Sequence, residues 1–302
     1  MTVDAEQAPG RKLTLGMVGL GRMGAGMTKR LRNAGHTVIG YDQNPAVSDV
    51  KTLRELVDAL PAPRIVWLMV PSGQITEDTM MDVGKLLSRG DIVVDGGNSY
   101  HKDTVRRGKM LSEMGVGFLD SGTSGGIWGF DNGFCIMAGG PREVFDTVEP
   151  ILASLAPEDG YAYVGPTGAG HFSKMVHNGI EYGMMQAYAE GFDLLQAAGE
   201  YDFDLAQISN LWNHSSVVRS WLLELAARAF EKDAKLDHLR GYVDDSGEGR
   251  WTVLEGVERG VDVTTLSHAL FARFRSREEN PFAMRVVAAL RNEFGGHAVK
   301  TQ

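Results

Sequence analysis

The stretch that decides the fold is Leu13-Thr-Leu-Gly-Met-Val-Gly19-Leu-Gly21-Arg-Met-Gly24, an apolar run that leads directly into glycines with the spacing GxGxxG. The apolar run predicts a buried parallel strand, and the segment after it predicts an amphipathic helix. Gly19 permits the sharp turn, Gly21 lets the backbone approach a pyrophosphate, and Gly24 lets helix and strand pack closely. The helix N-terminus adds unpaired N–H groups and the positive end of its dipole. This stretch therefore predicts the first unit of a dinucleotide-binding domain.

The expected partner of the glycine loop is Asp42, which follows the apolar run at 37–41 and comes about 20 residues after Gly19. A carboxylate there can bind both adenosine ribose hydroxyls and would repel a 2′-phosphate, which favours NAD+ over NADP+. The nearby Arg22 could partly offset that repulsion. The alternative is a structural glycine turn with a surface aspartate. The cofactor-binding residues that we expect are Gly19, Leu20, Gly21, Arg22, Met23, Gly24, Asp42, Val70 and Asn98.

The first half of the chain continues this alternation of apolar runs and amphipathic segments. Further strands are predicted at 37–41, 65–70, 91–95 and 116–119, with helices at 23–33, 52–60, 76–87 and 103–114. Runs at 134–138 and 161–164 flank a helix near 142–155 and extend the sheet. The pattern is typical of an α/β fold with a Rossmann-type, doubly wound parallel sheet.

The pattern changes after Gly165-Pro166, where strand-like runs largely disappear. Helices are predicted at 168–198, 204–214, 216–231, 250–258, 262–275 and 281–292. We therefore predict two domains. Residues 1–165 form the dinucleotide-binding domain, and residues 166–302 form an all-helical domain for substrate binding and oligomerisation.

Composition narrows the class of protein. The net charge of −9 argues against a nucleic-acid or membrane-surface protein. No apolar stretch approaches about 20 residues, and the N-terminal MTVDAEQAPGRK lacks the hydrophobic core of a secretory signal. A cytoplasmic enzyme is expected. The single cysteine, Cys135, lies in the apolar run 134–138 and is predicted to be a buried core thiol.

The most informative segment reads Gly168-Ala-Gly-His-Phe-Ser-Lys174-Met-Val-His177-Asn178-Gly-Ile-Glu181-Tyr182. On a helix with about 100° per residue, four polar side chains share one face: Lys174, His177, Asn178 and Glu181. The surrounding glycines and aliphatic residues indicate a largely buried helix, where an uncompensated charge is costly. We therefore favour a functional role for this face. The alternative is an ordinary solvated polar face.

Three short polar segments follow predicted strands: Val70-Pro71-Ser72, Asp95-Gly-Gly-Asn98-Ser99 and Ser121-Gly-Thr-Ser124-Gly125-Gly126. The carboxyl ends of parallel strands meet at one edge of a sheet, where ligands enter open α/β folds. Each segment alone could be an ordinary loop. Together they predict one crevice.

With these motifs the sequence resembles the 6-phosphogluconate dehydrogenases, a branch of the β-hydroxyacid dehydrogenase superfamily. The resemblance runs through GLGRMG, MVPSG, DGGNS, SGG, KMVHNGIEY, FARF and RNEFGGH, which span nearly the whole chain. The superfamily shares KxxxN and SGG, whereas HNGIEY is more specific to this branch. The length and the GGIWGF stretch resemble its short-chain form, which lacks the duplicated helical half of the long form.

The resemblance implies NAD+-dependent oxidative decarboxylation of 6-phospho-D-gluconate to D-ribulose 5-phosphate and CO2, a step of the pentose phosphate pathway, without a metal. It makes Lys174 the general base and Glu181 the later acid, and His177 and Asn178 complete the catalytic group. The residues implied to hold the sugar acid are Asn98, Ser124, Gly125, Gly126, His177 and Asn178. Those implied to hold the phosphate are Tyr182, Arg273, Arg291 and His297. In the family, the counterparts of Arg291 and His297 come from a neighbouring subunit, which implies a homo-oligomer, either a dimer or a tetramer.

Two departures from the long-form pattern stand out. The segment DDSGEGRWT carries Glu248 and Arg250, and a substrate-contacting lysine of the long form has no clear equivalent there. Ile127 and Trp128 replace two glutamates that follow SGG in the long form. Two other functions stay open. A non-decarboxylating β-hydroxyacid dehydrogenase would not need the arginine pair, and a catalytically inactive NAD-sensing protein would not need Lys174 and Glu181.

Overall fold

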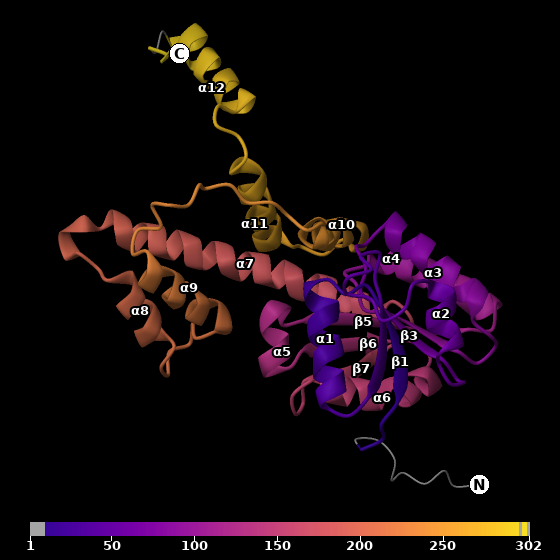
Figure 1. Cartoon of the computed structure of the whole chain (residues 1–302). Helices are drawn as coiled ribbons and strands as arrows, with labels where there is room; N and C mark the ends of the chain where they lie inside the picture. Colours follow the sequence, from indigo (N-terminus) through magenta and orange to yellow (C-terminus); the bar gives the residue numbers. More distant parts are fainter. Residues whose placement is uncertain (1–9, 296–297, 301–302) are drawn as a thin grey trace. The chain divides into compact units, whose positions relative to one another are not determined.

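The computed structural model describes residues 10–295 and 298–300, drawn as a ribbon in Figure 1. The chain divides into two compact units, residues 1–177 and 178–302. The helix α7 (Ala169–Ala197) runs through the change of unit. The boundary predicted at residue 165 lies at the end of the last strand, before this helix. As a domain limit it stays a prediction.

The first unit is built on a seven-stranded sheet in the order β2-β1-β3-β4-β5-β6-β7. Its strands are β1 (Thr14–Val18), β2 (Thr37–Tyr41), β3 (Ile65–Leu68), β4 (Ile92–Asp95), β5 (Gly117–Ser124), β6 (Cys135–Gly139) and β7 (Tyr161–Gly165). The helices are α1 (Arg22–Asn33), α2 (Leu53–Asp58), α3 (Gln74–Leu86), α4 (His101–Glu113), α5 (Gly129–Asn132) and α6 (Arg142–Leu155), with a short 3-10 turn at Gly126–Trp128. The predicted α/β fold class is confirmed.

Two apolar cores cover the two faces of this sheet. On one face the core joins α1 and α6 to strand residues such as Leu15 and Trp67. On the other, α2, α3 and α4 pack on residues such as Val66 and Val93. Alternate residues of β3 therefore enter opposite cores, as period-2 side-chain geometry requires, and Figure 1 shows the two helix layers.

The sheet departs from the expected parallel order at one place. Strands β1 to β5 pair in parallel, but β6 runs antiparallel to β5. The connection from Ser124 to Cys135 holds only short helical turns. A parallel return needs a longer crossover, so the chain turns back instead. Pairing with β6 also extends β5 to Ser124, beyond its predicted end at residue 119.

The prediction for Cys135 was wrong, because its thiol is exposed. Along β6, Ile136 and Ala138 point into the core. Successive side chains of a strand alternate between faces, so Cys135 points away from that core. The apolar run identified the strand correctly but not which of its faces is buried.

The second unit is helical. After α7 come a 3-10 turn (Gly199–Tyr201), α8 (Leu205–Trp212), α9 (Trp221–Lys232), α10 (Glu248–Arg259), α11 (Thr264–Arg275) and α12 (Phe282–Gly295). The side chains of Asp204 and Ser220 accept backbone N–H groups at the starts of α8 and α9. One core centres on Phe192. A second joins Tyr182 to Ala269 and Leu270 of α11. Among the described helices, none is both long and apolar enough to cross a membrane.

Candidate functional site

The glycine loop between β1 and α1 has the shape that a dinucleotide requires. Gly19 has φ +93°, and a Cβ there would lie 2.5 Å from the carbonyl oxygen of Met69. A Cβ on Gly24 would lie 2.0 Å from the carbonyl oxygen of Gly19. A Cβ on Gly21, by contrast, would meet nothing within 4 Å. The fold itself therefore requires glycine at positions 19 and 24. The backbone of Gly21, by contrast, is not covered by other protein atoms, which fits the close approach of a pyrophosphate.

Asp42 lies directly beside this loop. One carboxylate oxygen accepts the N–H of Leu20 at 2.7 Å, and the other accepts the N–H of Asn44 at 2.8 Å. The carboxylate is thus held against the backbone of the glycine loop. Arg22 is exposed at the first residue of α1. These residues fit a pyridine nucleotide, whose nicotinamide would supply the hydride acceptor.

The segments that follow β3 and β4 lie beside the glycine loop. A Cβ on Gly19 would lie 3.2 Å from Cγ1 of Val70, and one on Gly97 would lie 3.0 Å from the carbonyl oxygen of Val70. Val70 therefore lies between the glycine loop and the loop that carries Asn98, which is exposed. The structure brings these segments together as the sequence predicted; their individual roles stay predictions.

Gly21→Ala should weaken nucleotide binding without unfolding the protein. The backbone of Gly21 is extended, with φ −62°, and has room for a methyl group. The cost in stability should stay below about 1 kcal/mol, while the methyl group blocks the pyrophosphate and weakens NAD+ binding about tenfold or more. NAD+ titration and thermal denaturation measure the two effects. Gly24→Ala is the matched control and should destabilise the fold itself. Unchanged NAD+ affinity in Gly21→Ala would contradict the proposed pyrophosphate position.

The first turn of α7 is anchored to the sheet by a buried carboxylate. Asp120 on β5 accepts the N–H groups of Gly168 at 2.7 Å and His171 at 2.9 Å. His171 in turn pairs through Nδ1 with the hydroxyl of Thr104 on α4 at 2.7 Å. Burial raises the pKa of the Asp120 carboxyl, and His171 and the two N–H groups oppose that rise. A negative charge at a helix N-terminus is favourable, so Asp120 fixes where α7 begins.

Lys174 comes one turn later, where α7 packs directly against β5. A Cβ on Gly122 would lie 2.5 Å from Cβ of Lys174 and 2.7 Å from the carbonyl oxygen of Gly170. Lys174 is only 5% exposed, and its Nζ lies 3.5 Å from Nδ1 of His177. The predicted substrate residues Ser124, Gly125 and Gly126 follow at the end of the same strand. The structure thus brings the proposed base close to the SGG segment.

The polar face of α7 is the buried one. Lys174 is 5% and Asn178 9% exposed, whereas the apolar Ile180 is 51% exposed. His177 and Glu181 are half-buried. Polar groups that are buried must be satisfied by their neighbours, so this face is enclosed by protein and does not lie in solvent. The burial supports a functional face and argues against a solvated one.

In the second unit, the structure brings Tyr182 and Arg273 together. The Arg273 guanidinium carbon lies 3.4 Å from the centroid of the Tyr182 ring. The Tyr182 hydroxyl accepts the N–H of Ser246 at 3.1 Å, and Arg273 donates to the carbonyl oxygen of Asp244 at 3.1 Å. The segment 244–246 therefore belongs to this cluster. The guanidinium therefore lies over the face of the Tyr182 ring, as in a cation–π contact.

Two further arginines meet at the same segment. Asp245 binds Arg250 at 2.6 Å and Arg277 at 2.7 Å, and its hydrogen bonds to Arg250 and Arg277 lower the pKa of Asp245 to about 2. Arg250, at the departure from the long-form pattern, is thus paired with a carboxylate. Sequence reasoning missed Arg277 and Asp245, because only the fold places them together.

One of the predicted phosphate ligands that the structure describes, Arg291, is not joined to this cluster. Arg291 is exposed on α12, and the hydrogen bonds, ion pairs and ring contacts of the described residues join Tyr182 to Arg273 but not to Arg291. His297 lies outside the described residues. Sequence reasoning also missed Asp120, although a carboxylate inside the apolar run before SGTSGG was a signal for it.

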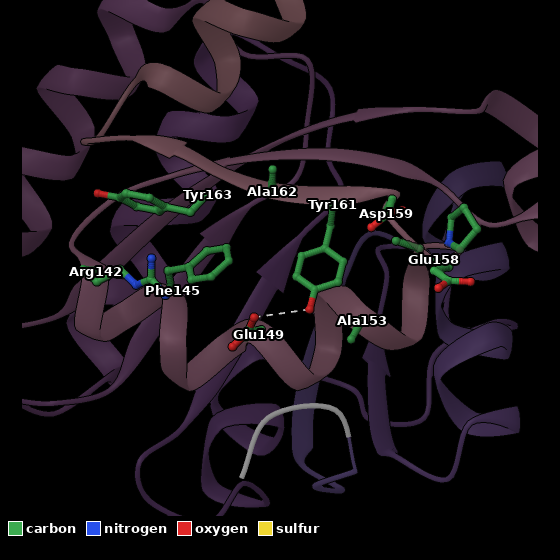
Figure 2. A pocket seen from close by; sticks show the side chains of 11 residues that line it. Arg142, Phe145, Glu149, Ala153, Glu158, Asp159, Tyr161, Ala162 and Tyr163 are labelled. Atoms are coloured by element: carbon green, nitrogen blue, oxygen red, sulfur yellow. Dashed lines mark hydrogen bonds between the residues drawn. The ribbon is translucent and has the colours of Figure 1, made fainter. Parts of the chain in front are cut away.

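A separate pocket of about 600 Å³ lies at the β7 edge of the sheet, between β7 and α6. Figure 2 shows Tyr161 there with its hydroxyl on Glu149, at 3.2 Å. Burial and the Glu149 charge raise the pKa of Tyr161. Arg142 lies over the rings of Phe145 and Tyr163. The residues that line this pocket include none of the predicted site residues.

Comparison with known proteins covers both units. Residues 14–165 match the NAD binding domain of 6-phosphogluconate dehydrogenase, and residues 170–300 match the C-terminal domain of that family. A Bacillus subtilis protein named "Putative 6-phosphogluconate dehydrogenase YqeC" is 45% identical, over 95% of this chain and 99% of that protein. The NAD(+)-dependent, decarboxylating 6-phosphogluconate dehydrogenase of Haloferax volcanii is 41% identical, over 95% of this chain and 98% of that protein.

Among solved structures, the chain is similar to Plasmodium falciparum 6-phosphogluconate dehydrogenase, with a TM-score of 0.76 and 28% identity, over 96% of this chain and 66% of that one. Mycobacterium tuberculosis 3-hydroxyisobutyrate dehydrogenase shares the fold, with a TM-score of 0.71 at 21% identity, over 93% of this chain and 100% of that one. The first match includes the glycine loop, and the second includes Lys174 and the rest of the polar face of α7. The chain therefore belongs to the 6-phosphogluconate dehydrogenase family, within the hydroxyacid dehydrogenase superfamily.

Proposed function

We propose that this dehydrogenase converts 6-phospho-D-gluconate to D-ribulose 5-phosphate and CO2, with NAD+ as the oxidant. The observation that carries the proposal is the buried polar face of α7, on which Lys174 packs against Gly122 beside the SGG segment. A relative of nearly equal length bears the name of this NAD(+)-dependent, decarboxylating activity.

Lys174 acts first as a general base. It takes the proton of the C3 hydroxyl. A nicotinamide nucleotide, held by the glycine loop and Asp42, would accept the hydrogen of C3 as hydride. The product is a 3-keto acid, which loses CO2 because its β-carbonyl accepts the electron pair of the C1–C2 bond. Lys174, which is now an ammonium, returns its proton to the developing enolate oxygen. The low exposure of Lys174 keeps water away from these transfers.

Glu181 acts last. It is two turns along α7 from Lys174 and on the same face. After CO2 has left, it protonates the carbon that becomes C1 of ribulose 5-phosphate, while Lys174 takes back the proton of the neighbouring hydroxyl, and the enediol becomes the ketose. His177 and Asn178, between them on this face, bind hydroxyl or carboxylate groups of the substrate. No other proton donor is needed to balance the reaction.

Tyr182 and Arg273 hold the phosphate end of the substrate, since they pair a hydroxyl with a permanent cation. Arg291 and His297 complete that site from a second copy of the chain. The exposure of the apolar side chains of α12 supports this proposal: Phe282 is 70% and Leu290 61% exposed. A surface helix with such side chains is typical of an interface. We therefore propose a homo-oligomer.

Asp42→Ser should narrow the preference for NAD+. The variant loses the charge that repels a 2′-phosphate and one hydrogen-bond acceptor for the ribose. A charge-assisted hydrogen bond contributes roughly 1.5–3 kcal/mol, so kcat/KM for NAD+ should fall about 10- to 150-fold. Because Asp42 also binds the N–H of Leu20, Asp42→Asn is the matched control that keeps an acceptor there but removes the charge. The test is the ratio of kcat/KM for NAD+ to kcat/KM for NADP+ in the wild type and in both variants. A wild type that favours NADP+ would show that Asp42 does not set the cofactor preference.

A substrate panel tests the proposed function. Purified protein is assayed for nicotinamide reduction with 6-phosphogluconate, gluconate and 3-hydroxyisobutyrate, each with NAD+ and NADP+. We expect 6-phosphogluconate with NAD+ to give the highest kcat/KM. A higher value for an unphosphorylated acid would instead favour a different β-hydroxyacid dehydrogenase. Binding of NAD+ with no turnover on any substrate would favour the NAD-sensing alternative.

A further inference from the structure

Arg107 on α4 is a buried cation that the proposed reaction does not use. It is 3% exposed. A guanidinium stays charged at any ordinary pH, so its burial requires partners on several sides. Nε donates to the Glu77 carboxylate at 3.1 Å, and Nη2 donates to the carbonyl oxygen of Gly73 at 2.9 Å. Nη1 lies 3.5 Å from the hydroxyl of Ser99. One side chain thus touches both the segment after β3 and the segment after β4.

These two segments carry predicted cofactor residues. Ser99 donates to one oxygen of Asp95 at 2.7 Å, and the other oxygen accepts the N–H of Gly97 at 3.1 Å. Asn98 is thereby held between two anchored neighbours. On the other side, Gly73, with φ +91°, directly precedes α3 and comes three residues after Val70. Arg107 therefore contacts the neighbours of both Val70 and Asn98, and a shift of Arg107 would change the positions of both residues.

The neighbouring Arg106 offers a natural contrast. It also binds Glu77, through both carboxylate oxygens, but it is 48% exposed. Its other partners, Asp103 and Met110, belong to its own helix. Together the two arginines lower the pKa of Glu77 to about 2, with the Arg106 hydrogen bond contributing most. Both arginines thus stabilise the Glu77 carboxylate. Of the two, only Arg107 also contacts the segments of Gly73 and Ser99.

We infer that Arg107 is a positioning residue for the nucleotide site. Its guanidinium fixes the distance between the Gly73 and Ser99 segments. Val70 and Asn98 therefore already have their binding positions before the cofactor arrives. The inference rests on the nucleotide binding in the proposed function but not on the identity of the substrate. A preset site binds more tightly, because the loops lose less conformational freedom on binding.

The test compares Arg107→Lys with Arg106→Lys by NAD+ titration and thermal denaturation. Each variant keeps the positive charge, but a lysine at 107 lacks the planar fork with which Arg107 contacts Glu77, Gly73 and Ser99 together. We expect Arg107→Lys to bind NAD+ about tenfold more weakly and Arg106→Lys to stay within about twofold of the wild type. With substrate present, the KM for NAD+ should rise while kcat at saturating NAD+ changes little. A merely structural role would lower the thermal midpoint and leave NAD+ affinity unchanged; that result would overturn the inference.

If Arg107→Lys does not fold, Ser99→Ala decides the question, since it releases the β4 segment from Arg107 and Asp95. Weaker NAD+ binding supports the inference, and wild-type binding overturns it. The titration uses NAD+ alone, without substrate. A protein that binds NAD+ but does not oxidise 6-phosphogluconate would therefore refute the proposed reaction and still leave Arg107 testable.

Discussion

Lys174→Met is expected to lower kcat by about 10³-fold or more, while the NAD+ affinity stays within about twofold of the wild type. Methionine keeps the unbranched stem that packs on Gly122 and removes only the ammonium group. The loss should therefore be confined to proton transfer. Single-turnover kinetics with 6-phosphogluconate and a separate NAD+ titration distinguish the two quantities.

The control for this variant is Lys29→Met, on α1. Lys29 is exposed and lies over the ring of Phe130, 4.6 Å from its centroid. The same chemical change there should leave kcat close to that of the wild type. If Lys174→Met turned over substrate at the wild-type rate, another group would be the base. The proposed catalytic role of the polar face of α7 would then be wrong.

Gly122→Ala should damage both stability and catalysis. The new methyl group would meet Cβ of Lys174 and the backbone of Gly170 at less than 3 Å, so α7 must shift away from β5. Such overpacking costs about 1–3 kcal/mol in the free energy of unfolding. A displacement of about 1 Å at a catalytic group can lower kcat about 10²-fold. Denaturant titration and steady-state kinetics measure the two effects.

A double variant separates misplacement of the base from general damage. If Gly122→Ala acts through Lys174, adding it to Lys174→Met should lower kcat little further, because residues that act together are not additive. Gly191→Ala, in α7 with nothing within 4 Å of its Cβ, is the control and should leave kcat unchanged. A full multiplicative loss in the double variant would show that Gly122→Ala lowers kcat independently of Lys174 and would contradict this explanation.

The elements of the fold could be predicted because their signals are local. Apolar runs of strand length and the helix periodicity lie in contiguous sequence, and the glycine loop has a fixed spacing. The end of β5 could not be predicted in the same way. Its last residues read as a loop, and only pairing with β6 makes them a strand. The face on which Cys135 lies likewise depends on tertiary packing.

The candidate site divides in the same manner. Lys174, Asn178 and Glu181 could be found because one helix carries them. The partners that anchor the site come from distant sequence: Asp120 caps α7, and Arg277 meets Asp245. Long-range pairs of this kind leave no local pattern in the sequence.

The most direct test of the central proposal is the fate of C1 of the substrate. Wild-type protein is incubated with NAD+ and 6-phosphogluconate labelled with 13C at C1, and labelled CO2 and reduced nicotinamide are measured together. We predict that one labelled CO2 is released for each hydride transferred, with ribulose 5-phosphate as the other product. Reduced nicotinamide without labelled CO2 would contradict the proposal and make the protein a non-decarboxylating dehydrogenase of the same superfamily.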